Sequence, residues 1–160
     1  MIEPIRLVFE VECPADDAFA TWTERTSTWW PPSHTVSAAD GLEVRFEPRV
    51  GGRIFERTPA GDEHDWGELT AWEPPDRLGY LWHLRADRAD ATEVEIRFVS
   101  VDDDRTRVEI EHRGWERLGV AGEERRDRNR GGWAGLLPHY VAAANGPPST
   151  NASETGGTNR

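Results

Sequence analysis

An apolar stripe near the C-terminal end of the sequence determines what the rest of the chain has to provide. Within residues 131–145 the large apolar side chains recur at intervals of three and four residues, the spacing of one helix face. The members of this stripe are Trp133, Leu136, Leu137, Tyr140, Val141 and Ala144. A helix with one long apolar face needs a second layer against which that face is buried. We therefore expect the preceding chain to form a sheet for it.

Pro138 lies inside this predicted helix but away from the apolar stripe. A proline in a helix removes one backbone N–H and clashes with a carbonyl one turn earlier, here that of Ala134. We expect a single helix that bends at this point. The alternative is a helix that breaks into two pieces near Leu137.

Most of the chain before the helix alternates between apolar and polar residues, which is typical of strands with one buried face. The expected strands lie at residues 5–11, 42–47, 53–57, 66–72, 78–82, 94–98 and 108–110. A short helix beginning near Pro14 follows the first strand and ends before the WWPP segment at residues 29–32. The order predicts an α+β fold, in which an antiparallel sheet is covered by helices on one face.

Composition limits the organisation and the partners. The chain of 160 residues fits one domain, expected over residues 1–145, followed by a disordered tail at residues 146–160. A net charge of −11 argues against nucleic acid and anionic membranes as partners. The single Cys13 fits a reducing cytoplasm, and neither a signal peptide nor a membrane-spanning segment is expected.

Six segments, in this order, resemble one known family. They are VECPADDAFATWT, WWPP, FEPRVGGRIFE, WGELTAWEPPDRLGYLW, TRVEIEHRGW and GGWAGLLPHYV. The chain is similar to the START-like (SRPBCC) superfamily, and within it to bacterial homologues of the heat shock protein 90 ATPase activator C-terminal domain. The resemblance implies the helix-grip fold, a curved antiparallel sheet of about six or seven strands around a long C-terminal helix. It also implies a cavity between sheet and helix that often holds an apolar small molecule.

The sequence contains none of the common motifs of catalytic or metal sites. CxxC, HExxH, GxSxG and a phosphate-binding glycine loop are all absent. The five histidines do not have the spacing of metal ligands. We therefore expect no metal and no cofactor.

Four polar residues on the expected strands are the candidates for acid–base chemistry. Strand parity places Glu56 with Ile54, Glu68 with Trp66, and His112 with Ile110, while Tyr80 lies among apolar neighbours. A carboxylate or an imidazole in such surroundings acquires a shifted pKa. The alternatives are an edge position that reaches water or a buried ion pair with an arginine.

Two hypotheses for function follow, with a third from the family name. The first is a protein that binds a hydrophobic or aromatic molecule in a cavity between sheet and helix. The expected ligand-binding residues are Phe46, Trp66, Tyr80, Trp82, Phe98, Ile110, Leu137, Tyr140 and Val141. The second is a cyclase, dehydratase or hydrolase, which needs two polar groups converging in that cavity. The third is activation of the heat shock protein 90 ATPase; the eukaryotic activator has a separate chaperone-docking domain that is not found in this sequence.

Overall fold

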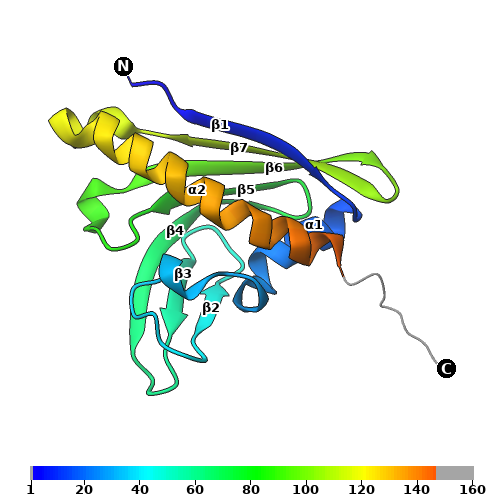
Figure 1. Ribbon diagram of the computed structural model, residues 1–160, viewed down its shortest axis with the longest axis horizontal. Coiled ribbons are helices and arrows are strands. Elements are labelled where there is room, and N and C mark those ends of the chain that lie inside the picture. The colour runs from blue at the N-terminus through cyan, green and yellow to red at the C-terminus, as the bar shows by residue number, and fades with distance from the viewer. Residues whose placement is uncertain (1, 147–160) are drawn as a thin grey trace.

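The computed structural model describes residues 2–146 and has seven antiparallel strands with one long helix across their concave face (Figure 1). The strands are β1 (Ile5–Val11), β2 (Glu43–Phe46), β3 (Arg53–Arg57), β4 (Glu63–Glu73), β5 (Arg77–Trp82), β6 (Thr92–Asp102) and β7 (Arg105–Arg113). Their order in the sheet is β1-β7-β6-β5-β4-β3-β2. The predicted α+β helix-grip fold is confirmed.

The connection from β1 to β2 crosses from one edge of the sheet to the other. It contains α1 (Ala15–Thr23) and the short 3-10 helices η1 (Thr26–Thr28) and η2 (Pro32–His34). Every other pair of consecutive strands is hydrogen-bonded side by side, as in a meander. Another 3-10 helix, η3 (Arg88–Asp90), lies in the connection from β5 to β6.

The long helix, α2 (Gly122–Asn145), follows the 3-10 helix η4 (Trp115–Ala121). It continues through Pro138 as one helix, so the alternative of two separate pieces is wrong. Its buried residues are Gly122, Trp133, Leu136, Tyr140 and Ala144, whereas Leu137 and Val141 are partly buried. The helix contains four glycines as well as this proline, and such a composition has low intrinsic helix propensity. Tertiary packing of the stripe must therefore supply much of its stability.

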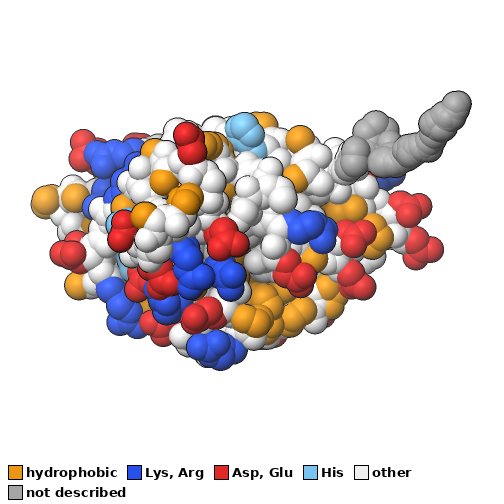
Figure 2. Space-filling view, turned by 90° about the horizontal axis from the view of Figure 1, so that it is seen from below, with side chains coloured by type: hydrophobic (Ala, Val, Ile, Leu, Met, Phe, Trp, Pro, Cys, Tyr) orange, Lys and Arg blue, Asp and Glu red, His pale blue; other side chains and the backbone are white. Residues whose placement is uncertain are grey.

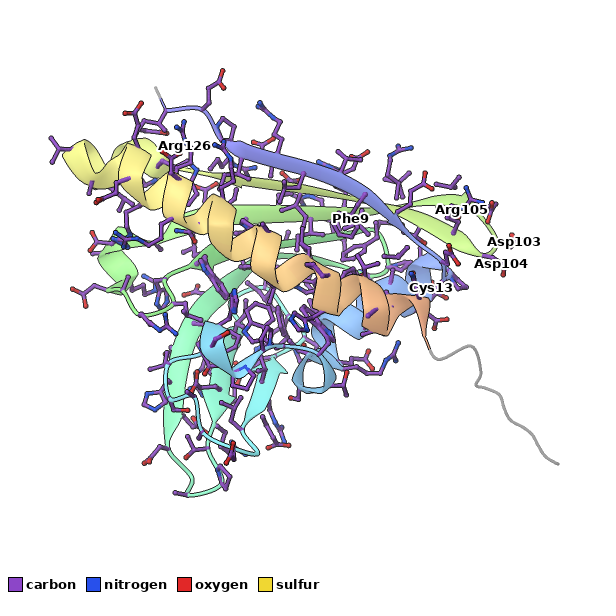
Figure 3. The ribbon with its side chains drawn as sticks, viewed as in Figure 1. Phe9, Cys13, Asp103, Asp104, Arg105 and Arg126 are labelled. Carbon is purple, nitrogen blue, oxygen red and sulfur yellow. The ribbon has the colours of Figure 1, made fainter. Side chains whose placement is uncertain are left out.

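Aromatic rings occupy the space between α2 and the sheet. Trp22 of α1 lies 4.7 Å from Tyr140 and 6.1 Å from Trp133, measured between ring centroids. Side chains drawn as sticks crowd this space (Figure 3). A second set joins β4 to β5, because Trp82 lies 5.8 Å from Trp66 and 5.6 Å from Tyr80. These large rings supply much of the buried apolar area of the core.

Strand β4 is irregular, and this changes which side chains face inward. Ile54 is opposite Gly67 whereas Phe55 is opposite Asp65, so Trp66 is an extra residue in the ladder. Such a bulge shifts the alternation by one residue. Glu68 is therefore opposite Leu81 on the outer face. The expectation that Glu68 shares a face with Trp66 is wrong for this reason.

The outer face of the sheet is covered by charged side chains. Glu95 pairs with Arg77, Arg97 and Arg113, at N–O distances of 2.7, 2.7 and 3.1 Å. Acidic and basic side chains are also interspersed over the view from below in Figure 2. Glu95 and these arginines form a network of ion pairs, which ties β5, β6 and β7 together on the outer face and keeps that face solvated.

The β6–β7 hairpin and the start of α2 lie at opposite ends of the molecule. Asp103, Asp104 and Arg105 lie at the tip of the β6–β7 hairpin, far from Arg126 near the start of α2 (Figure 3).

None of the helices within residues 2–146 combines the length and apolarity that a membrane crossing requires. The predicted tail lies, apart from Gly146, outside the described residues.

Candidate functional site

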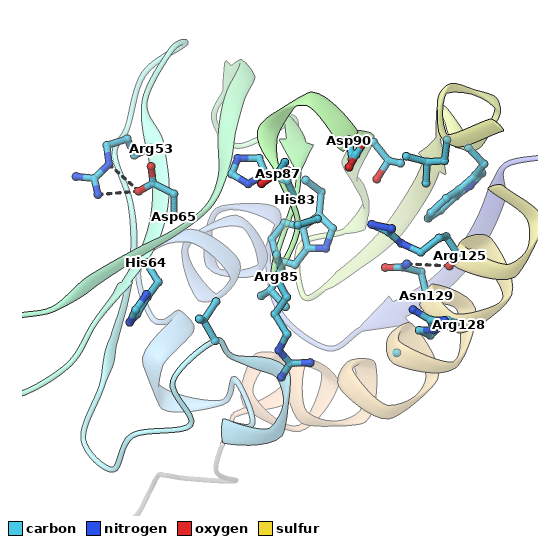
Figure 4. A pocket seen from close by; sticks show the side chains of 18 of the residues that line it. Arg53, His64, Asp65, His83, Arg85, Asp87, Asp90, Arg125, Arg128 and Asn129 are labelled. Atoms are coloured by element: carbon cyan, nitrogen blue, oxygen red, sulfur yellow. Dashed lines mark hydrogen bonds and ion pairs between the residues drawn. The ribbon is translucent and has the colours of Figure 1, made fainter. Parts of the chain in front are cut away.

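An open groove of about 1140 Å³ lies between the first half of α2, the β5–β6 connection and the β3–β4 hairpin (Figure 4). Its apolar lining is formed by Val36, Trp82, Leu84, Trp115 and Leu118. Its polar lining includes Arg53, Glu63, His64, Asp65, His83, Arg85, Asp87, Asp90, Thr92, Arg125, Arg128 and Asn129. The groove therefore combines aromatic surface with charges of both signs.

Arg85 fixes the wall formed by the β5–β6 connection. Its backbone has a φ of 59°, a left-handed conformation that is rare for residues other than glycine. Its guanidinium donates hydrogen bonds to the carbonyl oxygens of Ser33, at 3.0 Å, and Thr35, at 2.5 and 3.0 Å. These bonds join the connection to η2 and to the residue that follows it, and they bring Val36 to the groove.

Glu56 holds the same segment from inside the protein. Its Oε1 accepts hydrogen bonds from the Val36 N–H and the Trp66 indole, at 2.7 and 2.8 Å, and Oε2 accepts one from the Ser37 N–H at 2.8 Å. Burial alone would raise the pKa of this carboxyl, but the hydrogen bonds outweigh burial and the pKa is lowered. Because both oxygens are occupied, Glu56 positions the groove wall and is poorly placed to act as a base.

His112 of β7 is fully buried and joins the sheet to α2. The Trp133 indole donates to its Nδ1 at 3.0 Å, and its Nε2 lies 2.7 Å from Thr92 Oγ1. An indole N–H only donates, so Nδ1 accepts and the ring proton is on Nε2. Burial lowers the pKa of His112 to about 3, which keeps the imidazole neutral. The groove borders Thr92, so His112 lies behind the groove wall.

The four candidate polar residues do not converge on one point. Glu68 forms an ion pair with Arg88 on the outer face, at 2.6 Å. Tyr80 is buried among aromatic rings, and burial raises the pKa of its phenol. Within residues 2–146 no hydrogen bond joins any two of Glu56, Glu68, Tyr80 and His112. A shared acid–base site made of this set therefore has no geometric support.

The predicted ligand-binding residues fall into three groups. Trp82 lines the groove. Trp66, Tyr80 and Phe46 form a chain of rings behind it, with Phe46 6.2 Å from Tyr80. The remaining members belong to the core or pack against it, and they are Phe98, Ile110, Leu137, Tyr140 and Val141. Ligand contact by these residues stays a prediction.

Sequence reasoning did not identify the charged residues of the groove. Arg85, Asp87 and Asp90 fall in the β5–β6 connection, and Arg125 and Arg128 fall in the first turns of α2. Neither segment has a periodic pattern that relates it to the other.

The described residues 2–146 contain no group of three or more His, Cys, Asp or Glu side chains placed to hold a metal ion.

Comparison with known proteins gives one family and several solved structures. The chain matches the family model "Activator of Hsp90 ATPase homolog 1-like protein" over residues 12–141. No curated protein matches it. The structure is similar to Txn09, an anthrahydroquino-γ-pyrone synthase, with 34% identity, a TM-score of 0.57, and coverage of 77% of this chain and 84% of that chain.

Two further solved structures share the fold at lower identity. CalC, a self-sacrificing resistance protein from Micromonospora echinospora, has 23% identity and a TM-score of 0.63, covering 96% of this chain and 98% of that chain. Protein CV1439 from Chromobacterium violaceum has 18% identity and a TM-score of 0.63, covering 90% and 99%. At these identities the likeness concerns the fold alone.

Proposed function

The chain belongs to the Activator of Hsp90 ATPase homolog 1-like family, and from this premise we propose that it binds a flat, polycyclic aromatic molecule in the groove beside Trp82. Family membership alone does not assign an activity, so the proposal depends on the groove. The observation that carries it is the apolar lining of Trp82, Leu84, Trp115 and Leu118 surrounded by charged side chains.

The groove shares part of the character of a small-molecule site, but it is open, slightly larger, and lined by more polar than apolar surface. Binding sites for small molecules are mostly apolar, contain a few polar groups that orient the ligand, and have volumes of about 300–1,000 Å³. At about 1140 Å³ the groove accommodates several fused rings. Txn09, whose name refers to a polycyclic aromatic product, is 34% identical to this chain over the aligned residues.

The expected ligand-binding residues have two roles in this proposal. Trp82 contacts the ligand directly. Trp66 and Tyr80 pack against Trp82 from behind and hold its ring in one orientation, so that little side-chain entropy is lost on binding. The proposal places the protein in the cytoplasm, with neither nucleic acid nor membrane as a partner, on the basis of its acidic composition and single cysteine.

The direct test uses anthraquinone-2-carboxamide, an uncharged tricyclic probe. We expect saturable quenching of tryptophan fluorescence, and Trp82→Ala should weaken binding about tenfold by removing one aromatic contact. Trp72→Ala is the matched control, because Trp72 is also a half-buried strand tryptophan but does not line the groove. If the probe does not bind, or if both variants lose affinity equally, the groove is not the site.

A second candidate function is catalysis of a dehydrative ring closure, which the 34% identity to a pyrone synthase favours. In such a closure, a phenol oxygen attacks a ketone carbon of an o-hydroxyaryl 1,3-diketone and the phenol proton passes to a base. The attacked carbonyl oxygen takes a proton and becomes a hydroxyl, which gives a cyclic hemiketal. A base then removes a proton from the CH2 between the two carbonyl carbons while an acid protonates the departing hydroxyl, so that the ring C=C bond forms and water leaves. His64 and His83 are the candidates for the two roles, because they are the histidines that line the groove and histidine is the commonest general acid or base in enzymes.

This alternative is tested with 1-(2-hydroxyphenyl)-1,3-butanedione, whose closure gives 2-methylchromone and water. Chromatography would follow the product. Enzyme-dependent formation that is lost in His83→Gln or His64→Gln, while carboxamide binding persists, supports catalysis. Equal rates with and without the protein, together with binding of the carboxamide, leave a binding protein as the function.

A further inference from the structure

We propose that the ligand of the groove is an acid, and that Arg125 of α2 binds its carboxylate or ionised phenol. The inference builds on the proposed function, because it assigns a chemical class to the molecule that lies beside Trp82. It arises from one arginine whose surroundings differ from those of every other arginine in residues 2–146.

The guanidinium of Arg125 has no protein partner within the described residues. The other arginines there form ion pairs, except Arg25 and Arg85, which donate hydrogen bonds to carbonyl or hydroxyl oxygens. Arg125 forms neither contact, although the chain has 30 acidic residues and only 19 basic ones. Arg125 is partly buried as a residue, and its unpaired guanidinium is available to form charge-assisted hydrogen bonds with an external anion.

The position of Arg125 also suits a ligand. It projects from α2 into the groove, on the wall opposite the β5–β6 connection (Figure 4). The partly exposed ring of Trp82 lines the same groove, whereas Trp115 is buried beneath its wall. A planar molecule against Trp82 can therefore place an acidic group at its edge near Arg125.

The opposite wall carries acidic residues that would orient such a ligand. Asp87 and Asp90 line the groove from the β5–β6 connection, and neither has an ion-pair partner within residues 2–146. They repel an anion, whereas Arg125 attracts it, so the acid group is directed toward α2. The net charge of −11 disfavours the binding of anions elsewhere on the surface, so an acidic ligand should bind only beside Arg125.

The test compares two probes of nearly the same shape, anthraquinone-2-carboxylate and anthraquinone-2-carboxamide, by fluorescence titration or calorimetry. The wild-type protein should bind the carboxylate about tenfold more tightly, the usual size of a charge-assisted hydrogen-bonded pair in a partly exposed site. Arg125→Gln should abolish this preference and leave the affinity for the carboxamide unchanged. Added salt should reduce the preference in the wild-type protein.

Arg130→Gln is the matched control, because it removes the same charge from an exposed position of α2 outside the groove. It should retain the preference for the carboxylate. Equal wild-type affinities for the two probes, or a preference that survives Arg125→Gln, would overturn the inference while carboxamide binding still supported the groove as a site. Failure of both probes to bind would overturn the inference and the proposed function together.

Discussion

The interior between α2 and the sheet is mainly aromatic, whereas the groove is lined mainly by charged and polar residues, and the two regions also differ in whether their polar groups have hydrogen-bond partners. In the interior, Glu56 and His112 have hydrogen-bond partners on both of their polar atoms. Trp22 Nε1 is the only buried side-chain nitrogen or oxygen without a partner in residues 2–146. In the groove, Arg125 has no partner. A buried polar side chain with all its hydrogen-bond partners stabilises the fold, whereas a polar side chain without a protein partner remains free to bind a ligand.

The largest effect that distinguishes the two regions is expected at Trp133. Its indole packs against Trp22 and donates to His112, so Trp133→Ala removes ring packing and leaves a buried imidazole nitrogen without a donor. We expect a loss of about 3–5 kcal/mol in the free energy of unfolding, measured by urea denaturation. His139→Ala, an exposed change on the same helix, should have almost no effect. Comparable losses in the two variants would show that α2 does not pack through its apolar stripe.

The next effect is a pH dependence that originates in the interior. The folded-state pKa of His112, about 3, lies below its usual value of 6.5, so between these values only the unfolded chain binds the proton. The free energy of unfolding should therefore fall as the pH drops below 6.5, by about 2 kcal/mol at pH 5. Urea denaturation at several pH values would measure this slope. In His112→Gln it should be flatter, and an unchanged slope would assign the proton uptake to other groups.

A smaller effect should connect the interior to the groove. Glu56→Gln replaces one of the two accepting oxygens by an NH2 group, which then faces an N–H donor, and we expect a loss of about 1–2 kcal/mol in stability. Because the backbone N–H groups that Glu56 holds belong to the groove wall, carboxamide affinity should fall as well. Glu43→Gln, an exposed change on the neighbouring strand, serves as the control in both measurements. A lower free energy of unfolding with unchanged carboxamide affinity would show that the wall held by Glu56 does not contribute to ligand binding.

The smallest effect is expected at Glu68, which faces outward. Its ion pair with Arg88 is exposed, and such pairs contribute about 0.2–1 kcal/mol. Glu68→Gln should therefore change the free energy of unfolding by less than about 1 kcal/mol and leave carboxamide binding unchanged. A larger loss in a denaturant titration would mean that this side chain supports the β5–β6 connection and thereby the groove.

Alternation and helical spacing predicted the fold because each depends only on neighbouring residues in the sequence. The same reasoning failed where a strand departs from regular pairing, as at Trp66, which reverses the face of Glu68. Gly67 was a usable signal, since a glycine inside a strand often marks a bulge or a close backbone approach. A Cβ at this position would lie 2.1 Å from the carbonyl oxygen of Leu81.

The groove was less predictable than the fold for a different reason. Arg125 and Asp90 are brought together only when α2 crosses the sheet, and no local pattern relates a surface loop to the start of a helix. Trp82 was identified because it lies on a regular strand. The missing partner of Arg125 is a property of the three-dimensional arrangement, since the sequence has more than enough acids to pair with every arginine.

The composition of α2 has a consequence for the order in which the protein is made and folded. Four glycines and Pro138 make this segment a poor helix on its own, so it forms only once an aromatic surface is available to it. That surface belongs to segments that leave the ribosome earlier. During synthesis, the apolar surface that α2 covers therefore stays exposed to solvent until α2 has been made. In this interval the nascent chain is most prone to aggregation.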